Sequence, residues 1–145
     1  MAFNGNFMCT SFKVELMKAV HNFTTGTGDT FKLALYDNTP SFNASTTAYT
    51  TSGEVAASGT YTAGGGTLTN VTPTGSGTTA LTDFADLSFT SATITAYGAM
   101  IYNDSVAGDP SVCILDFGGA KTATNGTFTI IFPTPDATSA IIRIL

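Results

Sequence analysis

Residues 91–103 read Ser-Ala-Thr-Ile-Thr-Ala-Tyr-Gly-Ala-Met-Ile-Tyr-Asn, and this stretch decides the fold class of the chain. Ile94 and Met100 lie on one face of an alternating pattern, while Thr95 and Ile101 lie on the other. Such a period of two is the pattern of a β-strand. Both faces become apolar toward residue 103, which is typical of a strand at the centre of a sheet. The stretch therefore predicts a long central strand.

The same alternation recurs on both sides of this stretch and predicts further, shorter strands. Their ranges are 30–36, 54–57, 67–72, 79–84, 112–117, 127–132 and 138–144, and residues 87–89 alternate again. Gly118-Gly119 and Asn125-Gly126 frame a predicted connection, and Asn103–Pro110 is a predicted turn. Short strands about ten residues apart, with turn signals between them, are typical of sandwiches and barrels. We expect a mainly β protein, an antiparallel β-sandwich or barrel of about eight strands with one N-terminal amphipathic helix.

Residues 11–23 are predicted to form that helix. Spacings of four, four and three place its apolar residues on one face, namely Phe12, Leu16, Val20 and Phe23. Ser11 or Thr10 is the expected N-cap residue, and Thr24–Gly28 is expected to end the helix. Because only one face is apolar, we expect the helix to pack on a sheet.

One domain accounts for the chain, because 145 residues of which 43% are hydrophobic can build a single core. Residues 9–145 are expected to form this single β-rich domain. Residues 1–8 are interpreted as an extended N-terminal arm, since Asn and Gly interrupt any helical pattern around Phe3, Phe7 and Met8. Such arms either fray or lie across a neighbouring molecule.

Charge is scarce in this chain, and its scarcity excludes several functions. Only 10% of the residues are charged and Lys and Arg together number five, too few for the basic stripe of a general nucleic-acid binder. No signal peptide is recognisable, and no apolar run approaches the roughly 18 residues of a membrane helix. We expect a protein made in the cytoplasm, without nucleic-acid or membrane partners. Cys9 and Cys113 are predicted to be reduced, buried thiols.

Residues that support catalysis or metal binding are equally scarce. His21 is the only histidine and lacks a recognisable catalytic partner, so a structural or exposed role is expected. Two acidic pairs, Asp83 with Asp86 and Asp104 with Asp109, lie in or near predicted loops. They lack the spacing of a calcium-binding loop, and we expect solvated acids. The sequence predicts no enzymatic activity, no cofactor and no metal site.

Five stretches that are spread over nearly the whole chain form a distinctive set. They are NFMCTSFKVEL (6–16), DTFKLALY (29–36), NASTTAYT (43–50), YTAGG (61–65) and AIIRI (140–144). With these stretches the chain resembles a group of small structural virion proteins of tailed bacteriophages, including cyanophages. The resemblance implies a non-enzymatic capsid decoration or cement protein, made in the host cytoplasm, that binds and stabilises the outer surface of a shell of major capsid protein. At a symmetry axis of such a shell we expect a dimer or a trimer.

Contacts with the partner are expected from the arm, the helix flank and an exposed sheet edge. The residues predicted for this interface are Phe3, Phe7, Met8, Lys13 and Lys18. Two alternatives stay open: a tail, connector or fibre component of the phage particle, and a glycan-binding module. The glycan alternative uses a stacking platform made of Tyr36, Tyr49, Tyr61, Tyr97 and Tyr102.

Overall fold

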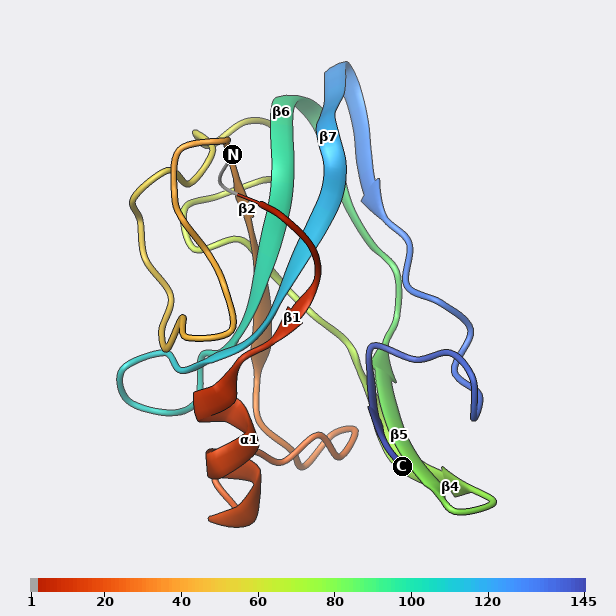
Figure 1. Ribbon diagram of the computed structural model, residues 1–145. Helices are drawn as coiled ribbons and strands as arrows, with labels where there is room; N and C mark the ends of the chain where they lie inside the picture. The colour runs from red at the N-terminus through yellow and green to blue at the C-terminus, as the bar shows by residue number, and fades with distance from the viewer. Residues whose placement is uncertain (1–2) are drawn as a thin grey trace.

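A computed structural model of the chain describes residues 3–145 and is mainly β, with two antiparallel sheets and one short helix (Figure 1). In chain order the elements are β1 (Phe7–Met8), α1 (Thr10–Met17), β2 (Phe31–Tyr36), β3 (Gly66–Thr67), β4 (Asn70–Ser76), β5 (Thr79–Phe84), β6 (Leu87–Asn103), β7 (Ser111–Ile130) and β8 (Ile142–Ile144). The sheets do not close into a barrel, and the arrangement is sandwich-like. The predicted fold class is confirmed.

The larger sheet has the strand order β1-β7-β6-β2-β3, and the smaller sheet has the order β4-β5-β8. β6 pairs with β2 along one edge and with β7 along the other, so the predicted central position is confirmed. Every residue of the range 98–103 is buried, which explains why both faces of the sequence become apolar there. In Figure 1 the smaller sheet stands apart from α1, on the opposite side of the lower half of the molecule.

β6 and β7 form one long ribbon that folds over at its top before it runs down toward the smaller sheet (Figure 1). Ser91 and Asn125, on the two strands of the ribbon, have left-handed backbones, with φ of 51° and 45°. The register shifts between Phe89 and Ala92 and again after Ala92. Bulges bend a strand and increase its local twist, so these irregularities account for the bend.

β7 is continuous, and the prediction of two separate strands at 112–117 and 127–132 was wrong. Gly118 and Gly119 have positive φ values and lie where the pairing shifts from Gly98–Asp116 to Ala96–Lys121. They form a bulge inside the strand instead of a connection between strands. The strand predicted at 54–57 is also absent, since among these residues Glu54 alone makes a single bridge, to Tyr36.

The helix is shorter than predicted, because α1 ends at Met17 and not at residue 23. Ala19 has φ of 56°, which ends the helical path. The N-cap residue is Cys9, which makes no side-chain capping bond. Beyond α1 the chain turns back toward the sheet, and the Phe23 ring stacks on Phe31 at 4.3 Å between ring centroids. Residues 18–23, which were predicted to continue the helix, instead bring Phe23 into contact with the sheet.

The described part of the arm, residues 3–8, lies on the chain's own larger sheet. Phe3 is buried with its ring 5.8 Å from that of Phe42, and the Gly5 N–H donates to Asp116 Oδ2 at 2.8 Å. Phe7 and Met8 then pair with β7 as strand β1. Residues 1–2 of the predicted arm lie outside the described residues.

Candidate docking groove

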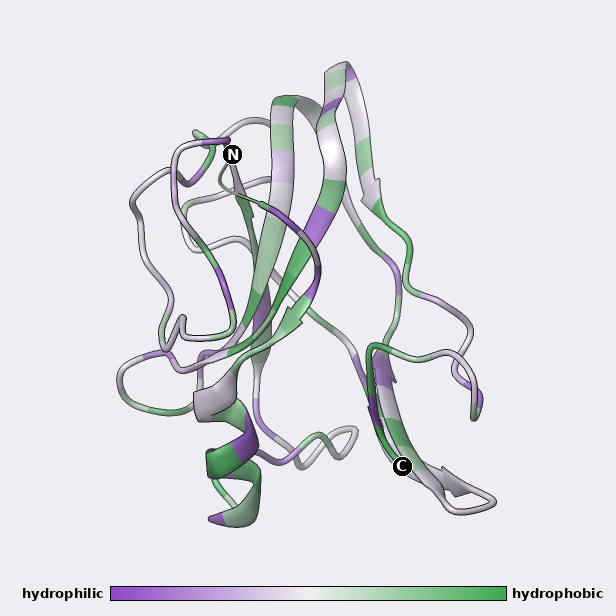
Figure 2. Cartoon of the chain, in the orientation of Figure 1, coloured by the Kyte–Doolittle hydropathy of each residue, from purple (hydrophilic) through white to green (hydrophobic). Residues whose placement is uncertain are grey.

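An apolar groove of about 490 Å³ lies between α1 and the smaller sheet. Figure 2 shows hydrophobic residues on both sides of it, on α1 and on β5 and β8. The residues that line it are Phe12, Leu16, Ala19, His21, Asn22, Phe23, Pro73, Ala80, Leu81, Thr82, Ile142 and Ile144. Most of these side chains are apolar, so the groove suits hydrophobic contact better than acid–base chemistry.

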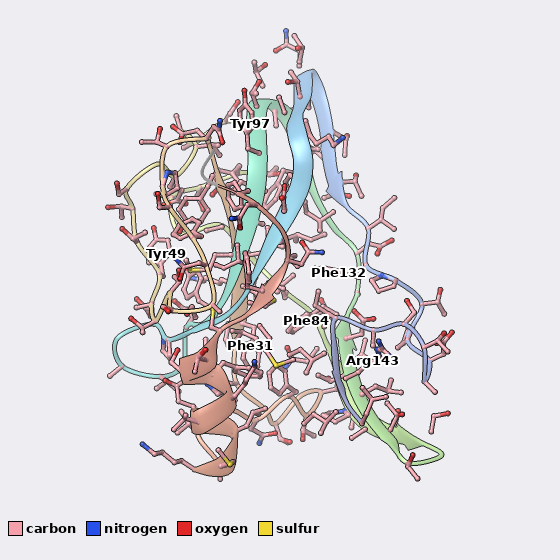
Figure 3. All side chains as sticks on the ribbon, viewed as in Figure 1. Phe31, Tyr49, Phe84, Tyr97, Phe132 and Arg143 are labelled. Carbon is pink, nitrogen blue, oxygen red and sulfur yellow. The ribbon has the colours of Figure 1, made fainter. Side chains whose placement is uncertain are left out.

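The inner side of the groove is held by a cluster of aromatic rings that joins the two sheets. Phe12 meets Phe23 edge-on at 6.0 Å, and Phe23 stacks on Phe31 of β2. Phe84 of β5 lies 5.7 Å from Phe31 and 5.9 Å from Phe132. Figure 3 shows the labelled rings of Phe31, Phe84 and Phe132 between the large sheet and the small one. Burial of such rings contributes strongly to stability, so the inner wall is well supported.

His21 fixes the end of α1 instead of serving as a free base. Its side chain is fully buried, with Nε2 2.7 Å from Glu15 Oε2 and Nδ1 3.0 Å from Asn103 Nδ2. Asn103 Oδ1 accepts from the Ser105 N–H, and Nδ2 also contacts Asp29 Oδ2 at 2.8 Å, so Nδ2 is the donor to His21. The imidazole therefore carries its proton on Nε2 and donates it to Glu15. Of the structural or exposed role that the sequence predicts for this histidine, its burial and its contacts correspond to the structural one.

The two edges of the smaller sheet differ in their protection. β4 carries Pro73, which has no N–H, and the Thr25 hydroxyl donates to the Asn70 carbonyl at 2.8 Å. β8 pairs with β5 alone, so its second edge has no partner strand among residues 3–145. Ile144 is 54% exposed and Leu145 is 89% exposed at this edge. The open edge of β8 and the groove therefore belong to one surface.

The predicted interface residues are distributed over three parts of the structure. Phe3 is buried in the chain's own core, so its ring is not on the surface. Phe7 and Met8 are half-buried in β1, at the edge of the larger sheet. Lys13 and Lys18 are exposed on α1 and at its C-cap, on the helix that forms one wall of the groove.

Sequence reasoning missed the apolar residues of the groove itself. The helical spacing assigns Leu16 to a core-facing helix face, and the alternation assigns Ile142 and Ile144 to the last strand, without a partner surface for either. The alternation of AIIRI at 140–144 was the available signal. It indicates a strand with one apolar face, but it does not say that this face stays open.

Four of the five tyrosines of the predicted platform instead pack around a carboxylate, and Tyr97 lies apart from them. Glu54 accepts hydrogen bonds from the Tyr49 hydroxyl at 2.6 Å, the Tyr61 hydroxyl at 2.8 Å and the Gly64 N–H at 2.7 Å. Burial is the main cause that raises the pKa of both tyrosines, and the nearby Glu54 raises it further. Tyr36, Tyr61 and Tyr102 are buried, while Tyr49 and Tyr97 are half-buried. The cluster seals the 37–65 connection onto the larger sheet.

The acids expected to be solvated differ from one another. Asp83 is fully buried, which contradicts that expectation for this residue. Its Oδ1 accepts from the Phe84 N–H, whereas its Oδ2 has no hydrogen-bond partner. Burial raises the pKa of Asp83, and Asp86 raises it further. Asp104 is exposed and pairs with Lys32 at 3.1 Å. Asp83 lies inside β5 with its side chain buried, whereas Asp104 lies in the turn that follows β6, and this explains the difference.

Both thiols, Cys9 and Cys113, are free and buried as predicted, and burial raises the pKa of each. Within residues 3–145 no group of three or more His, Cys, Asp or Glu side chains is placed to hold a metal ion. The helical part of these residues includes no segment of the length and apolarity that a bilayer crossing requires.

Comparisons with protein-family models, with curated proteins and with solved structures give no match to this chain.

Proposed function

We propose that this chain is a non-enzymatic structural protein of a tailed-phage virion, a capsid decoration or cement protein. In this role it binds the outer surface of the assembled shell of major capsid protein and stabilises the shell. The observation that carries the proposal is the open apolar groove between α1 and the smaller sheet, with Leu16 and Ile144 on its two walls. Apolar surface left open on an otherwise well-packed domain is typical of a protein interaction site.

The resemblance of the sequence motifs supports the same function from an independent direction. NFMCTSFKVEL at 6–16 and AIIRI at 140–144 include residues from both walls of the groove. A symmetric shell presents many copies of one site, and a protein that bridges neighbouring sites binds tightly through modest contacts. A dimer or trimer at a symmetry axis is therefore the assembly that we propose.

The packing of the tyrosines does not favour the glycan-binding alternative. A stacking platform needs exposed ring faces, whereas Tyr36, Tyr61 and Tyr102 are buried. A tail, connector or fibre location involves the same kind of apolar contact, and experiment distinguishes it from the capsid location.

The test is a binding assay with shells assembled from the capsid protein of the phage that encodes this chain. We expect saturable co-sedimentation with shells, little affinity for unassembled subunits, and a higher rupture temperature for decorated shells. Cross-linking mass spectrometry of intact virions gives the location, with carboxylate-reactive reagents added because the chain has only four lysines. Links mainly to the capsid protein support the proposal. Links mainly to tail or connector proteins contradict it.

A further inference from the structure

The groove presents two kinds of unmatched surface that one occupant can cover together. Its apolar part consists of side chains such as Leu16 and Ile144. Its polar part is the open edge of β8, where backbone N–H and C=O groups have no strand beside them. In Figure 1, β8 lies on the side of β5 that faces α1. An extended chain supplies both backbone partners for such an edge and apolar side chains for the groove.

The charges beside the groove limit the chemistry of that extended chain. The whole chain has ten acidic and five basic residues, yet α1 and its C-cap carry two lysines and a single acid. That acid, Glu15, is bound to His21, while Lys13 and Lys18 are exposed. On β8, Arg143 donates to the Ala137 carbonyl at 2.9 Å and is already engaged. Neither lysine lines the groove, but both place positive charge on the helix beside it, on an otherwise acidic protein, and favour a partner with acidic residues at the rim of the groove.

We infer that the groove binds an extended, apolar segment of the major capsid protein that carries acidic flanking residues and adds a strand to β8. The inference rests on the proposed function for the identity of the partner. It adds the mode of binding: backbone hydrogen bonds along 142–144, apolar side chains inserted between α1 and the smaller sheet, and carboxylates beside Lys13 and Lys18.

The first test compares two exposed isoleucines in the shell co-sedimentation assay. Ile144 is 54% exposed and lines the groove, whereas Ile131 is 76% exposed and lies outside it. We expect Ile144→Asp to weaken shell binding about tenfold or more, because a charge then faces the apolar segment. The matched control Ile131→Asp is expected to bind within about twofold of the wild type. Circular dichroism and urea unfolding confirm that both variants are folded.

The second test compares lysines. We expect Lys13→Glu and Lys18→Glu each to weaken binding several-fold at low salt and less at high salt, because the interaction is electrostatic and screened. Lys121→Glu, on an exposed part of β7 away from the groove, makes the same charge change and is the control. Equal effects of the three substitutions would show that net charge alone governs binding and would overturn the acidic-segment inference.

Hydrogen exchange of the shell-bound protein tests the added strand directly. We expect new amide protection in 142–144 on shell binding, since added backbone hydrogen bonds slow exchange. Wild-type binding to shells with no new protection there, and with Ile144→Asp as tight as Ile131→Asp, overturns this inference and leaves the proposed function intact. Failure of the wild type to bind shells contradicts the proposed function itself. A dimer in free solution that Ile144→Asp dissociates identifies a second copy of this chain as the occupant and overturns the capsid segment.

Discussion

The two sheets of this protein differ in what covers their apolar faces. The larger sheet is covered by the 37–65 connection, which Glu54 holds together through three internal hydrogen bonds. Tyr36 and Tyr102 of the sheet attach this connection by donating to the Thr50 and Gly64 carbonyls. The smaller sheet faces a groove of about 490 Å³ with apolar walls. One chain with only 10% charged residues therefore covers one surface with tyrosines packed around a single carboxylate and leaves the other surface open. Because both surfaces belong to the same weakly charged chain, low charge does not explain why only one of them is open. The groove is therefore a local feature of the smaller sheet.

The two regions also differ in how they are attached. The larger sheet contains the long β6–β7 ribbon, whose pairing extends over most of both strands. The smaller sheet pairs with no strand of the larger one and contacts it through rings such as Phe84 and Phe31, at 5.7 Å. We expect the smaller sheet to be the less stable region, because ring contacts join it to the larger sheet and no strand pairing does.

The substitution with the largest expected effect removes the ring that joins the regions. Phe84→Ala deletes contacts with Phe23, Phe31 and Phe132 and should lower the free energy of unfolding by about 3–5 kcal/mol. Urea unfolding at neutral pH measures the loss. Hydrogen exchange should show faster opening of β4, β5 and β8 than of β6. Uniform acceleration over both sheets would contradict the claim that the smaller sheet opens separately.

Glu54→Ala removes the centre of the cover over the larger sheet and should lower the free energy of unfolding by about 2–3 kcal/mol, because the buried Tyr61, the half-buried Tyr49 and the Gly64 N–H lose an acceptor. Glu54→Gln keeps the shape and is expected to recover part of the loss. Urea unfolding of both variants is the measurement. A loss as large for Gln as for Ala would show that the charge, and not the acceptor geometry, holds the connection.

The same cluster predicts behaviour at high pH. Burial raises the pKa of Tyr49 and Tyr61 above the ordinary value near 10. A raised folded-state pKa contributes stability that is fully present below the unfolded-state value and is lost as the pH rises toward the folded-state value. We therefore expect alkaline unfolding to begin above about pH 10. Tyrosinate absorbance at 295 nm should rise together with the loss of the circular dichroism signal, whereas ionisation before unfolding would contradict the packing.

Local patterns in the sequence predict the strands well where a pattern is compatible with only one kind of local structure. The alternation of 91–103 placed the central strand correctly, and 30–36 and 79–84 differ from β2 and β5 by at most one residue. Gly118-Gly119 is different, because two adjacent glycines suit a turn and a bulge equally. Only the pairing of β7 with β6 selects the bulge.

The candidate site was harder to predict, because it exists only between elements distant in the sequence. The helix pattern points to Lys13 and Lys18 on its flank, but the wall opposite the helix comes from β4, β5 and β8. The helix end depends on His21 and Phe23 reaching the sheet, which no local spacing reveals. Tertiary contacts that override local propensity explain these failures.

A smaller effect is expected at Asp83, where the smaller sheet contains a buried carboxyl with an unpartnered Oδ2. Its pKa is raised by burial, so its contribution to stability is fully present below the unfolded-state value near 3.9 and is lost as the pH rises through the folded-state value. Asp83→Asn stays neutral and should raise the free energy of unfolding by about 1 kcal/mol at pH 7, and by much less at pH 3.5.

Urea unfolding at the two pH values measures this effect. Asp104→Asn is the matched control in the other region, since Asp104 is exposed and pairs with Lys32. We expect it to lower the stability at pH 7 by less than about 1 kcal/mol, as exposed ion pairs contribute little. A pH-independent effect of Asp83→Asn would contradict the raised pKa.

The smallest expected effect is at the bend that connects the two regions through the β6–β7 ribbon. Ser91 is exposed with φ of 51°, a conformation that glycine adopts with little strain. Ser91→Gly relieves about 1–2 kcal/mol of strain but increases the freedom of the unfolded chain by up to about 1 kcal/mol, so a net gain of about 0.5 kcal/mol is expected. Thr93→Gly, two residues along the same strand, relieves no strain and should lower the stability. Thermal unfolding of the Ser91→Gly and Thr93→Gly variants is the measurement. A loss of stability in both variants would mean that Ser91 is not strained and that the bend comes from the register shifts alone.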